Sequence, residues 1–161
     1  MEQTLRPLAP EDAASAAALI RRAFQAQPVQ TDPPSSALRE TAGSIRAAIG
    51  LGGGACIDRA GALTGVVLWA ERDGGLYFGR LAVHPGFRRC GIARQLVAAV
   101  EAEARRRGLQ RVHLSTRLVL HDNRRLFASC GFRETELRAH DGYPTPTFVV
   151  MEKLLDGPGS D

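Results

Sequence analysis

The feature that most constrains the fold is a change of hydrophobic period near residue 55. From there the stretches ACIDRAG (55–61), ALTGVVLWAER (62–72) and GLYFGRLAVHP (75–85) read as strands joined by short glycine-containing turns. Strands connected by such short turns pair antiparallel. The sequence therefore predicts a three-stranded antiparallel meander, and any fold for this chain has to be built around it.

A helix and a further strand follow the meander directly. Apolar residues recur every four positions from Ile92 to Ala104, and Gly108 ends this helix after a last turn rich in arginine. The next strand, residues 111–118, lies parallel to the strand ending at Val83, because a strand–helix–strand unit crosses over right-handed. The expected fold class is therefore mixed α/β, with a mostly antiparallel sheet that contains one parallel pair.

Further elements flank this unit on both sides. They are a strand over 3–8, a helix opened by Pro10 that ends near Pro28, a second helix containing Leu38, Ala42, Ile45 and Ile49, a short helix capped by Asp122 or Asn123, and two closing strands within 132–140 and 145–155. A chain of 161 residues builds one hydrophobic core. We therefore expect a single domain over residues 1–155, followed by a flexible tail over 156–161.

The composition argues against membrane, disulfide and metal proteins. No apolar stretch approaches the roughly 20 residues that a membrane span needs, and the N-terminus has no apolar signal core. Cys56, Cys90 and Cys130 are odd in number and lack C-x-x-C spacing, which favours neither a disulfide framework nor a zinc site. We therefore expect a cytoplasmic protein with reduced thiols, no metal and no membrane partner.

The net charge of +4 comes almost entirely from arginine, since Lys153 is the single lysine. A nucleic-acid-binding protein gathers such charge on one face and places stacking aromatic residues between the basic ones. Here the arginines are spread along the chain and aromatic residues make up 6%. A basic nucleic-acid-binding protein is therefore the least favoured alternative. The local excess of arginine suits a small polyanion better, and its members are Arg88, Arg89, Arg94, Arg124 and Arg125.

The stretch VHPGFRRCGIAR, residues 83–94, connects the third strand of the meander to the following helix. Pro85 and Gly86 end the strand, and the residues from Arg88 onward begin a helix whose first amide groups have no partner within the helix. Such amides and the positive end of the helix dipole bind anions, and Gly91 has no side chain to keep a phosphate away. The alternative is an ordinary glycine turn ahead of a helix.

Two common phosphate-binding motifs are excluded for this stretch. A Walker A loop requires a lysine, which is absent here. A Rossmann fingerprint requires a parallel βαβ unit, whereas the strands before this helix are expected to be antiparallel. A pyrophosphate bound here would therefore belong to another kind of fold.

The same stretch resembles the signature of a known family. Arg88, Gly91 and Ala93 match the Q/R-x-x-G-x-G/A signature of the GNAT superfamily of acyl-CoA-dependent N-acyltransferases. The LAVHP segment (81–85) and the GF pair (131–132) stand where the family has a strand end and the end of its last helix. The order of expected elements is similar over nearly the whole chain. The resemblance implies a GNAT-like fold, with helices on both faces of the sheet and a splayed parallel pair, and an N-acetyltransferase that uses acetyl-CoA.

The resemblance also implies where the cosubstrate binds. In such enzymes the amides of the signature loop hold the pyrophosphate of CoA, and the pantetheine arm lies between the splayed strands, here 76–83 and 111–117. The backbone of Leu81 and Val83 then pairs with the arm, and the Leu81 amide donates to the thioester oxygen as a catalytic oxyanion donor. The implied contact set is Leu81, Ala82, Val83, Arg88, Arg89, Cys90, Gly91, Ile92, Ala93, Arg94, Asn123 and Phe127.

The chain departs from the family where a proton is supplied to the leaving thiolate. The tyrosine that serves as general acid in the family falls at Phe127, which has no proton to give. Tyr143, Cys130 or water is the candidate replacement. The asparagine that often begins the family's last helix falls at Leu120, and Asn123 either caps this helix or contacts the pantetheine.

The general base is a second departure. The glutamate that some relatives carry falls at Tyr77. For each remaining candidate the alternative is a solvated surface residue, or a core histidine in one case, His113. The candidates are Glu71, Asp73, His84, His113 and His140.

The sequence as a whole predicts direct transfer of the acetyl group of acetyl-CoA to a primary amine of a small molecule or peptide. A non-catalytic acyl-CoA-binding sensor is the alternative, because Phe127 and Tyr77 replace the two proton-transfer residues. The segments 28–36 and 140–147 are expected to border the acceptor, and Trp69 either lines the acceptor cleft or fills the core. The resemblance also implies a homodimer.

Overall fold

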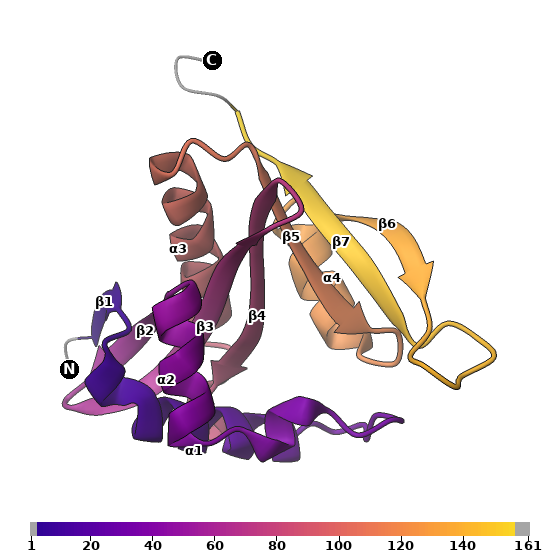
Figure 1. Cartoon of the computed structure of the whole chain (residues 1–161). Coiled ribbons are helices and arrows are strands. Elements are labelled where there is room, and N and C mark those ends of the chain that lie inside the picture. The colour runs from indigo at the N-terminus through magenta and orange to yellow at the C-terminus, as the bar shows by residue number, and fades with distance from the viewer. Residues whose placement is uncertain (1–2, 157–161) are drawn as a thin grey trace.

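A seven-stranded sheet forms the centre of the computed structural model, which describes residues 3–156 (Figure 1). Its strands are β1 (Gln3–Pro7), β2 (Gly54–Arg59), β3 (Ala62–Arg72), β4 (Gly75–Val83), β5 (Arg111–Arg117), β6 (Arg133–Arg138) and β7 (Phe148–Leu154). They lie in the order β1-β2-β3-β4-β5-β7-β6, and every neighbouring pair is antiparallel except β4 and β5. The predicted fold class, with its meander and its one parallel pair, is confirmed. Of the predicted tail, residues 157–161 lie outside the described residues.

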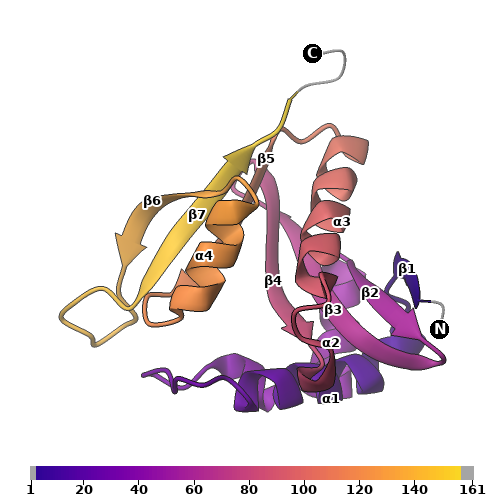
Figure 2. The same cartoon turned by 180° about the vertical axis from the view of Figure 1, so that it is seen from behind.

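Within the described residues, four α-helices cover the sheet, two on each face (Figures 1 and 2). They are α1 (Ala13–Gln25), α2 (Ala42–Leu51), α3 (Ile92–Arg106) and α4 (His121–Ser129). Each face has its own apolar core: Ile20 and Ile45 are buried beneath α1 and α2, and Leu96 and Phe127 are buried beneath α3 and α4. No helix in this part of the chain is both long enough and apolar enough to cross a membrane.

Two helices begin elsewhere than the sequence predicts. The second helix starts at Ala42, and Leu38 lies in a separate 3-10 turn, because the Thr41 hydroxyl accepts a hydrogen bond from the Ser44 amide and fixes the helix start. The predicted cap of the last helix is wrong. Leu120 occupies the capping position of α4 without a side-chain bond, and Asp122 instead lies one residue inside the helix.

The helix after the signature loop starts at Ile92 rather than at Arg88. Gly91 precedes it with φ +78°, a left-handed conformation that glycine adopts without the steric cost of a side chain. Residues 88–91 are therefore a turn that leads into the helix rather than its first residues.

Strands β4 and β5 diverge soon after they meet (Figure 1). Their parallel pairing comprises Leu76 with Val112 and Tyr77 with His113. Beyond this point β4 remains paired with β3 alone, and β5 remains paired with β7 alone. The two strands thus open a gap in the middle of the sheet, as the resemblance implied.

A bulge interrupts β4 within this gap. Gly79 pairs with Leu68 and Ala82 pairs with Val66, so Arg80 and Leu81 share the single opposing residue Val67. A bulge of this kind leaves the extra residue out of the ladder and re-aims its backbone groups. Arg80 adopts φ +54°, which marks the position of the irregularity.

Candidate active site

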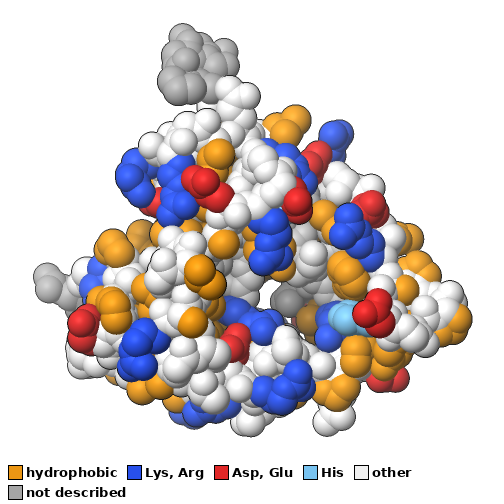
Figure 3. All heavy atoms as spheres, in the orientation of Figure 1, with side chains coloured by type: hydrophobic (Ala, Val, Ile, Leu, Met, Phe, Trp, Pro, Cys, Tyr) orange, Lys and Arg blue, Asp and Glu red, His pale blue; other side chains and the backbone are white. Residues whose placement is uncertain are grey.

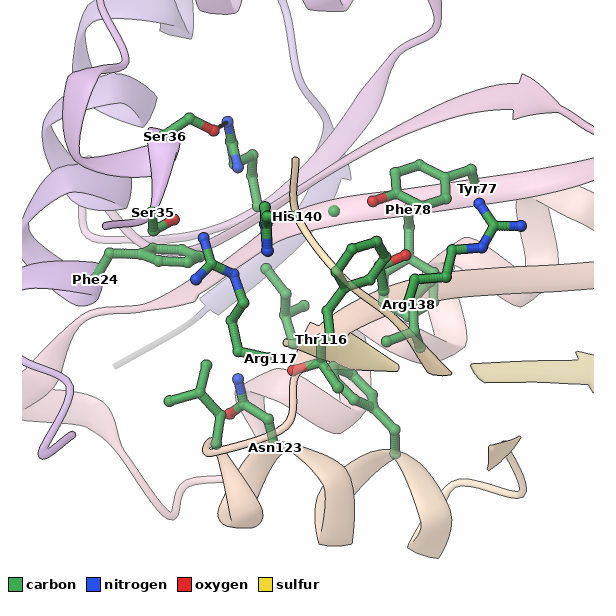
Figure 4. A pocket seen from close by; sticks show the side chains of 18 of the residues that line it. Phe24, Ser35, Ser36, Tyr77, Phe78, Thr116, Arg117, Asn123, Arg138 and His140 are labelled. Atoms are coloured by element: carbon green, nitrogen blue, oxygen red, sulfur yellow. Dashed lines mark hydrogen bonds between the residues drawn. The ribbon is translucent and has the colours of Figure 1, made fainter. Parts of the chain in front are cut away.

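A cleft of about 470 Å³ opens where β4 and β5 separate (Figure 4). In the space-filling view the surface between these strands is hollowed, and Lys and Arg side chains surround the hollow (Figure 3). The lining residues are Phe24, Ser35, Ser36, Arg72, Tyr77, Phe78, Gly79, Arg80, Leu81, Leu114, Ser115, Thr116, Arg117, Leu120, Asn123, Phe127, Arg138, His140 and Phe148.

The alternation of side chains along the strands divides this lining between two faces of the sheet. Leu114 belongs to the core beneath α3 and α4, so Arg117, three residues later on β5, points to the opposite face. Lining residues on the α3–α4 face form the helix-side wall, which consists of Phe78, Leu81, Leu114, Thr116, Leu120, Asn123 and Phe127. Those on the α1–α2 face form the arginine wall, which consists of Phe24, Ser35, Ser36, Arg72, Tyr77, Arg80, Arg117, Arg138, His140 and Phe148.

The helix-side wall contains no charged side chain. Phe127 is buried, and its ring packs edge-on against Phe78 with centroids 5.8 Å apart. Thr116 and Asn123 supply the polar side chains of this wall. Since Asn123 does not cap α4, its amide is available to a molecule in the cleft. A chain of methylene and amide groups, such as pantetheine, matches this surface better than a charged molecule does.

The arginine wall carries four guanidinium groups, and no carboxylate lies among the described lining residues. Two of these arginines have an acidic partner outside the lining. The Arg80 guanidinium donates to the Glu40 carboxylate over 2.7 Å, and Arg138 forms an ion pair with Glu136. These two arginines are therefore partly neutralised and held in place.

The other two arginines of this wall have no carboxylate within salt-bridge distance in the described chain. Arg117 is half-buried and donates one hydrogen bond to the Pro33 carbonyl over 2.6 Å. Burial lowers the pKa of the Arg117 guanidinium from its ordinary value. Arg72 lies over the Tyr77 ring, with its guanidinium carbon 4.3 Å from the ring centroid. This half of the cleft therefore has a positive electrostatic potential.

The loop ahead of α3 presents free amide groups to solvent. Within the described chain, the backbone amides of residues 88–94 donate to no protein acceptor. Residues 88–91 are exposed, and Gly91 has no atom within 4 Å of the position where a Cβ would stand. Arg94 reaches across to α4, where it donates to the Ser129 hydroxyl over 2.7 Å. Successive free amides at a helix N-terminus are a site for phosphate groups.

The Leu81 amide lies at the bulge, between this loop and the cleft. The bulge leaves Leu81 without a register partner of its own on β3, and the pairing of β4 with β5 has already ended at Tyr77. An amide that the ladder does not use is available to an oxygen atom placed in the gap. The structure thus brings the predicted oxyanion donor to the cleft, where Leu81 is a lining residue.

Among the candidate bases, the two acidic residues lie outside the cleft lining. Glu71 is exposed and forms an ion pair with Arg107 at 3.5 Å. Asp73 lies in the β3–β4 turn with φ +53°. Glu71 therefore lies away from the cleft, because its side chain faces Arg107 at the end of α3, whereas the next residue, Arg72, lines the cleft.

Two of the candidate histidines have structural partners. His84 accepts a hydrogen bond from the Gly86 amide over 2.9 Å. His113 is buried, and its ring lies 2.8 Å from the Arg72 carbonyl through Nε2. Burial lowers the pKa of His113. The alternative of a satisfied core histidine is therefore what the structure has at His113.

His140 is the candidate base that lines the cleft. Its Nδ1 forms a hydrogen bond with the Thr147 hydroxyl, and its ring packs edge-on against Phe148 with centroids 5.0 Å apart. Burial, with Arg117 as the second cause, lowers the pKa of His140 below its ordinary 6.5. The imidazole is therefore neutral at pH 7 and able to accept a proton.

The candidate acids lie at or beyond the edge of the cleft. The Tyr143 hydroxyl donates to the Asp32 carboxylate over 2.5 Å and joins the segment 140–147 to the segment 28–36. This hydrogen bond raises the pKa of Tyr143, so the phenol is held in its protonated form. Cys130 ends α4 and does not line the cleft. Trp69 packs against the core beneath α3 rather than in the cleft.

Several lining residues carry no signal in the sequence. Arg72, Arg117 and Arg138 stand at the ends of three different strands and meet because β6 and β7 fold back beside β5. Phe24 and Ser35 come from α1 and the segment after it. A local motif does not link these positions, so their convergence is a property of the sheet order.

Comparison with known proteins agrees with this geometry. No curated protein matches the chain in sequence. The ribosomal-protein-S18-alanine N-acetyltransferase from Escherichia coli is similar in structure, with a TM-score of 0.74, 20% identity, and coverage of 98% of this chain and 97% of that one. The PaiA N-acetyltransferase from Thermoplasma acidophilum, in complex with coenzyme A, has a TM-score of 0.76 and 17% identity, with coverage of 96% of this chain and 99% of that one. YncA from Salmonella typhimurium, described as an acetyltransferase with its cofactor acetyl-CoA, has a TM-score of 0.74 and 19% identity, with coverage of 100% of this chain and 98% of that one.

The fold and the site define an acyltransferase that takes its acyl group from coenzyme A. The sequence of residues 17–132, most of the chain, matches the acetyltransferase (GNAT) family. The chain belongs to this family. The acetyltransferase class and the acetyl-CoA cosubstrate expected from the sequence are thereby confirmed.

Proposed function

We propose that the protein transfers the acetyl group of acetyl-CoA directly to the primary amine of a small molecule or peptide. The observation that carries this proposal is the alignment of three features along one path. These are the free amides of residues 88–94, the gap between β4 and β5, and the bulge at Leu81, which has no register partner of its own on β3. Residues 1–155 act in it as one catalytic unit.

Binding begins at the signature loop. The amides ahead of α3 hold the pyrophosphate, and the exposed side chains of Arg88 and Arg89 add charge-assisted hydrogen bonds. The pantetheine arm then extends along the backbone of β4 from Val83 toward Leu81, past Asn123 and Phe127 on the helix-side wall. This path leaves the acetyl group at the bulge, facing the arginine wall.

The chemical step needs a neutral amine and a donor for the oxyanion. The amine nitrogen attacks the thioester carbonyl carbon, and the carbonyl oxygen accepts a hydrogen bond from the Leu81 amide as negative charge develops. The tetrahedral intermediate then breaks its C–S bond, which releases the amide product and the CoA thiolate. Water supplies the proton to this thiolate, because Phe127 has no proton to give and Tyr143 is bonded to Asp32.

His140 accepts the proton that the amine loses. The role requires the tautomer in which Nδ1 donates to the Thr147 hydroxyl, which leaves Nε2 to accept a proton from the cleft. The lowered pKa of His140 keeps this nitrogen unprotonated at neutral pH. A positioned base of this kind contributes about 10²- to 10⁴-fold to the rate.

The test is a turnover assay with acetyl-CoA and a panel of primary amines, in which the free thiol is measured and the product is identified by mass. Amine-dependent thiol release with a product heavier by one acetyl group supports the proposal. Saturable binding of acetyl-CoA with thiol release no faster than in the absence of amine would instead support a sensor. Reaction without amine and with a tertiary amine are the matched controls.

A further inference from the structure

The two walls of the cleft differ in charge, and this difference bears on the acceptor. The helix-side wall is uncharged along the path proposed for pantetheine. The acceptor therefore meets the arginine wall, with four guanidinium groups and no carboxylate among the described lining residues (Figure 4). An acceptor that enters as an ammonium ion adds its positive charge to those of Arg72 and Arg117, which have no carboxylate within salt-bridge distance in the described chain.

Like charges disfavour the protonated form of an amine. The positive potential of the arginine wall therefore helps the bound amine to lose its proton, which the reaction requires. The same potential weakens binding of any acceptor whose charge is positive alone, such as a polyamine. An acceptor that carries its own anion avoids this penalty and gains an ion pair.

Arg117 is the group placed to receive such an anion. It is half-buried, and it donates one hydrogen bond to the Pro33 carbonyl, whereas a guanidinium has five N–H donors. Asp32 is the acidic residue whose charge acts on Arg117, but it forms no ion pair with Arg117 and accepts a hydrogen bond from Tyr143. Figure 4 shows the Arg117 side chain extending from the end of β5 toward Phe24 and Ser35, inside the cleft.

The other three arginines of the wall are less available. Arg80 and Arg138 have carboxylate partners, and Arg72 lies over the ring of Tyr77 near the narrow end where β4 and β5 are still paired. A partly desolvated cation without an acidic partner is costly for a folded protein, and it is found where a ligand supplies the missing charge.

We infer that the acceptor is a small amine that carries a carboxylate, as amino acids do, and that Arg117 binds this carboxylate. This inference rests on the proposed function, since it names the substrate class of the same site. The planar guanidinium matches the two oxygens of a carboxylate, and the amine is then held between Arg117 and the acetyl group at Leu81. Arg117 is a specificity residue that does not touch the reacting atoms, and its charge acts on the chemistry by adding to the effect of burial, which lowers the pKa of His140.

The experiment compares amino acids with their own carboxamides as acceptors. Each pair, for example phenylalanine and phenylalaninamide or methionine and methioninamide, shares its side chain and its amine but differs in the negative charge. The amine of the carboxamide is the less basic of the two, so intrinsic reactivity favours the carboxamide. We expect the opposite order, with kcat/KM about 10- to 100-fold higher for the amino acid.

The variant Arg117→Gln is expected to remove this preference. Its kcat/KM for the amino acid falls to within about 3-fold of that for the carboxamide. The carboxamide value changes by a much smaller factor, through the effect that Arg117 has, after burial, on the pKa of His140, and the affinity for acetyl-CoA stays near that of the wild type. Arg117→Lys keeps the charge without the planar fork and retains a partial preference. Arg105→Gln, an exposed residue of α3 away from the cleft, is the matched control and leaves both substrates unchanged.

The outcomes separate the inference from the proposed function. Thiol release with carboxamides or polyamines that equals or exceeds that with amino acids leaves the acetyltransferase proposal standing and overturns the inference. An equal loss for amino acid and carboxamide in Arg117→Gln also overturns it, because Arg117 then acts only through the fold. Absence of thiol release with every amine contradicts the proposed function itself.

Discussion

The helix-side wall and the arginine wall line one cleft from opposite faces of the sheet. They differ in charge and in the origin of their residues. The helix-side wall is uncharged and comes from β4, β5 and α4, with Leu120 just ahead of α4. The arginine wall takes its charged residues from the ends of β3, β5 and β6 and from the bulge in β4. The difference teaches that one gap in a sheet serves two ligands because alternate side chains of the same strand face opposite ways.

The largest expected effect is loss of the oxyanion donor between the walls. Leu81→Pro removes the amide N–H at a bulge, a position that tolerates proline better than a regular strand does. We expect kcat to fall about 10²- to 10³-fold. Leu81→Ala, which keeps the amide, is the matched control. An unchanged kcat in Leu81→Pro, with acetyl-CoA binding intact by calorimetry, would place the oxyanion donor elsewhere.

The proposed base tests the arginine wall. His140→Gln is expected to lower kcat at pH 7 about 10²-fold, because the amine then loses its proton to water. Since burial and Arg117 lower the pKa of His140, the wild-type kcat rises with pH and levels off below pH 6.5. The His140→Gln variant does not show this rise of kcat with pH. The control is His121→Gln, at an exposed residue of α4 that does not line the cleft, and it retains the rise. Loss of the rise in both variants would contradict His140 as the base.

The signature loop lies beyond the uncharged wall and is tested by adding a charge. Gly91→Asp places a carboxylate beside the proposed pyrophosphate, and we expect the Kd for acetyl-CoA to rise about 10- to 100-fold. Gly108→Asp is matched in backbone strain, since Gly108 has φ +73° at the other end of α3 and no neighbour within 4 Å. A similar rise in both variants would show that strain alone weakens binding.

The smallest expected effect concerns His113, which lies on β5 beneath Tyr77. Burial lowers the folded-state pKa of His113, so the unfolded chain binds its proton more readily. This contribution to stability is present above pH 6.5 and is lost as the pH falls from there toward the folded-state value. Thermal unfolding between pH 7.5 and pH 5 should show a smaller fall in Tm for His113→Gln than for the wild type.

Much of the fold follows from local patterns, whereas the cleft depends on how distant elements assemble. The hydrophobic period and the turn residues predict the meander, the long helix and the parallel pair. The spacing of glycine and arginine predicts the signature loop. The arginine wall is different, because Arg138 reaches the same cleft as Arg117 through the β5-β7-β6 order, and Arg72 reaches it from β3 on the other side of the gap. The cap of α4 differs from the prediction, and Glu71 lies outside the cleft lining, for the same reason: the environment of a side chain at an element's end is set by tertiary contacts.

The bulge in β4 has a consequence for the whole cleft. Before it, Leu76 and Phe78 point toward α3 and α4, and after it Leu81 and Val83 do, so the parity of the strand is reversed. With Arg80 deleted, the regular alternation of the strand would keep Leu81 on the α3–α4 face, and its peptide unit would rejoin the ladder with β3. The inserted residue thus shifts the alternation of the strand by one position. This shift sets the side of the sheet from which an incoming nucleophile must approach.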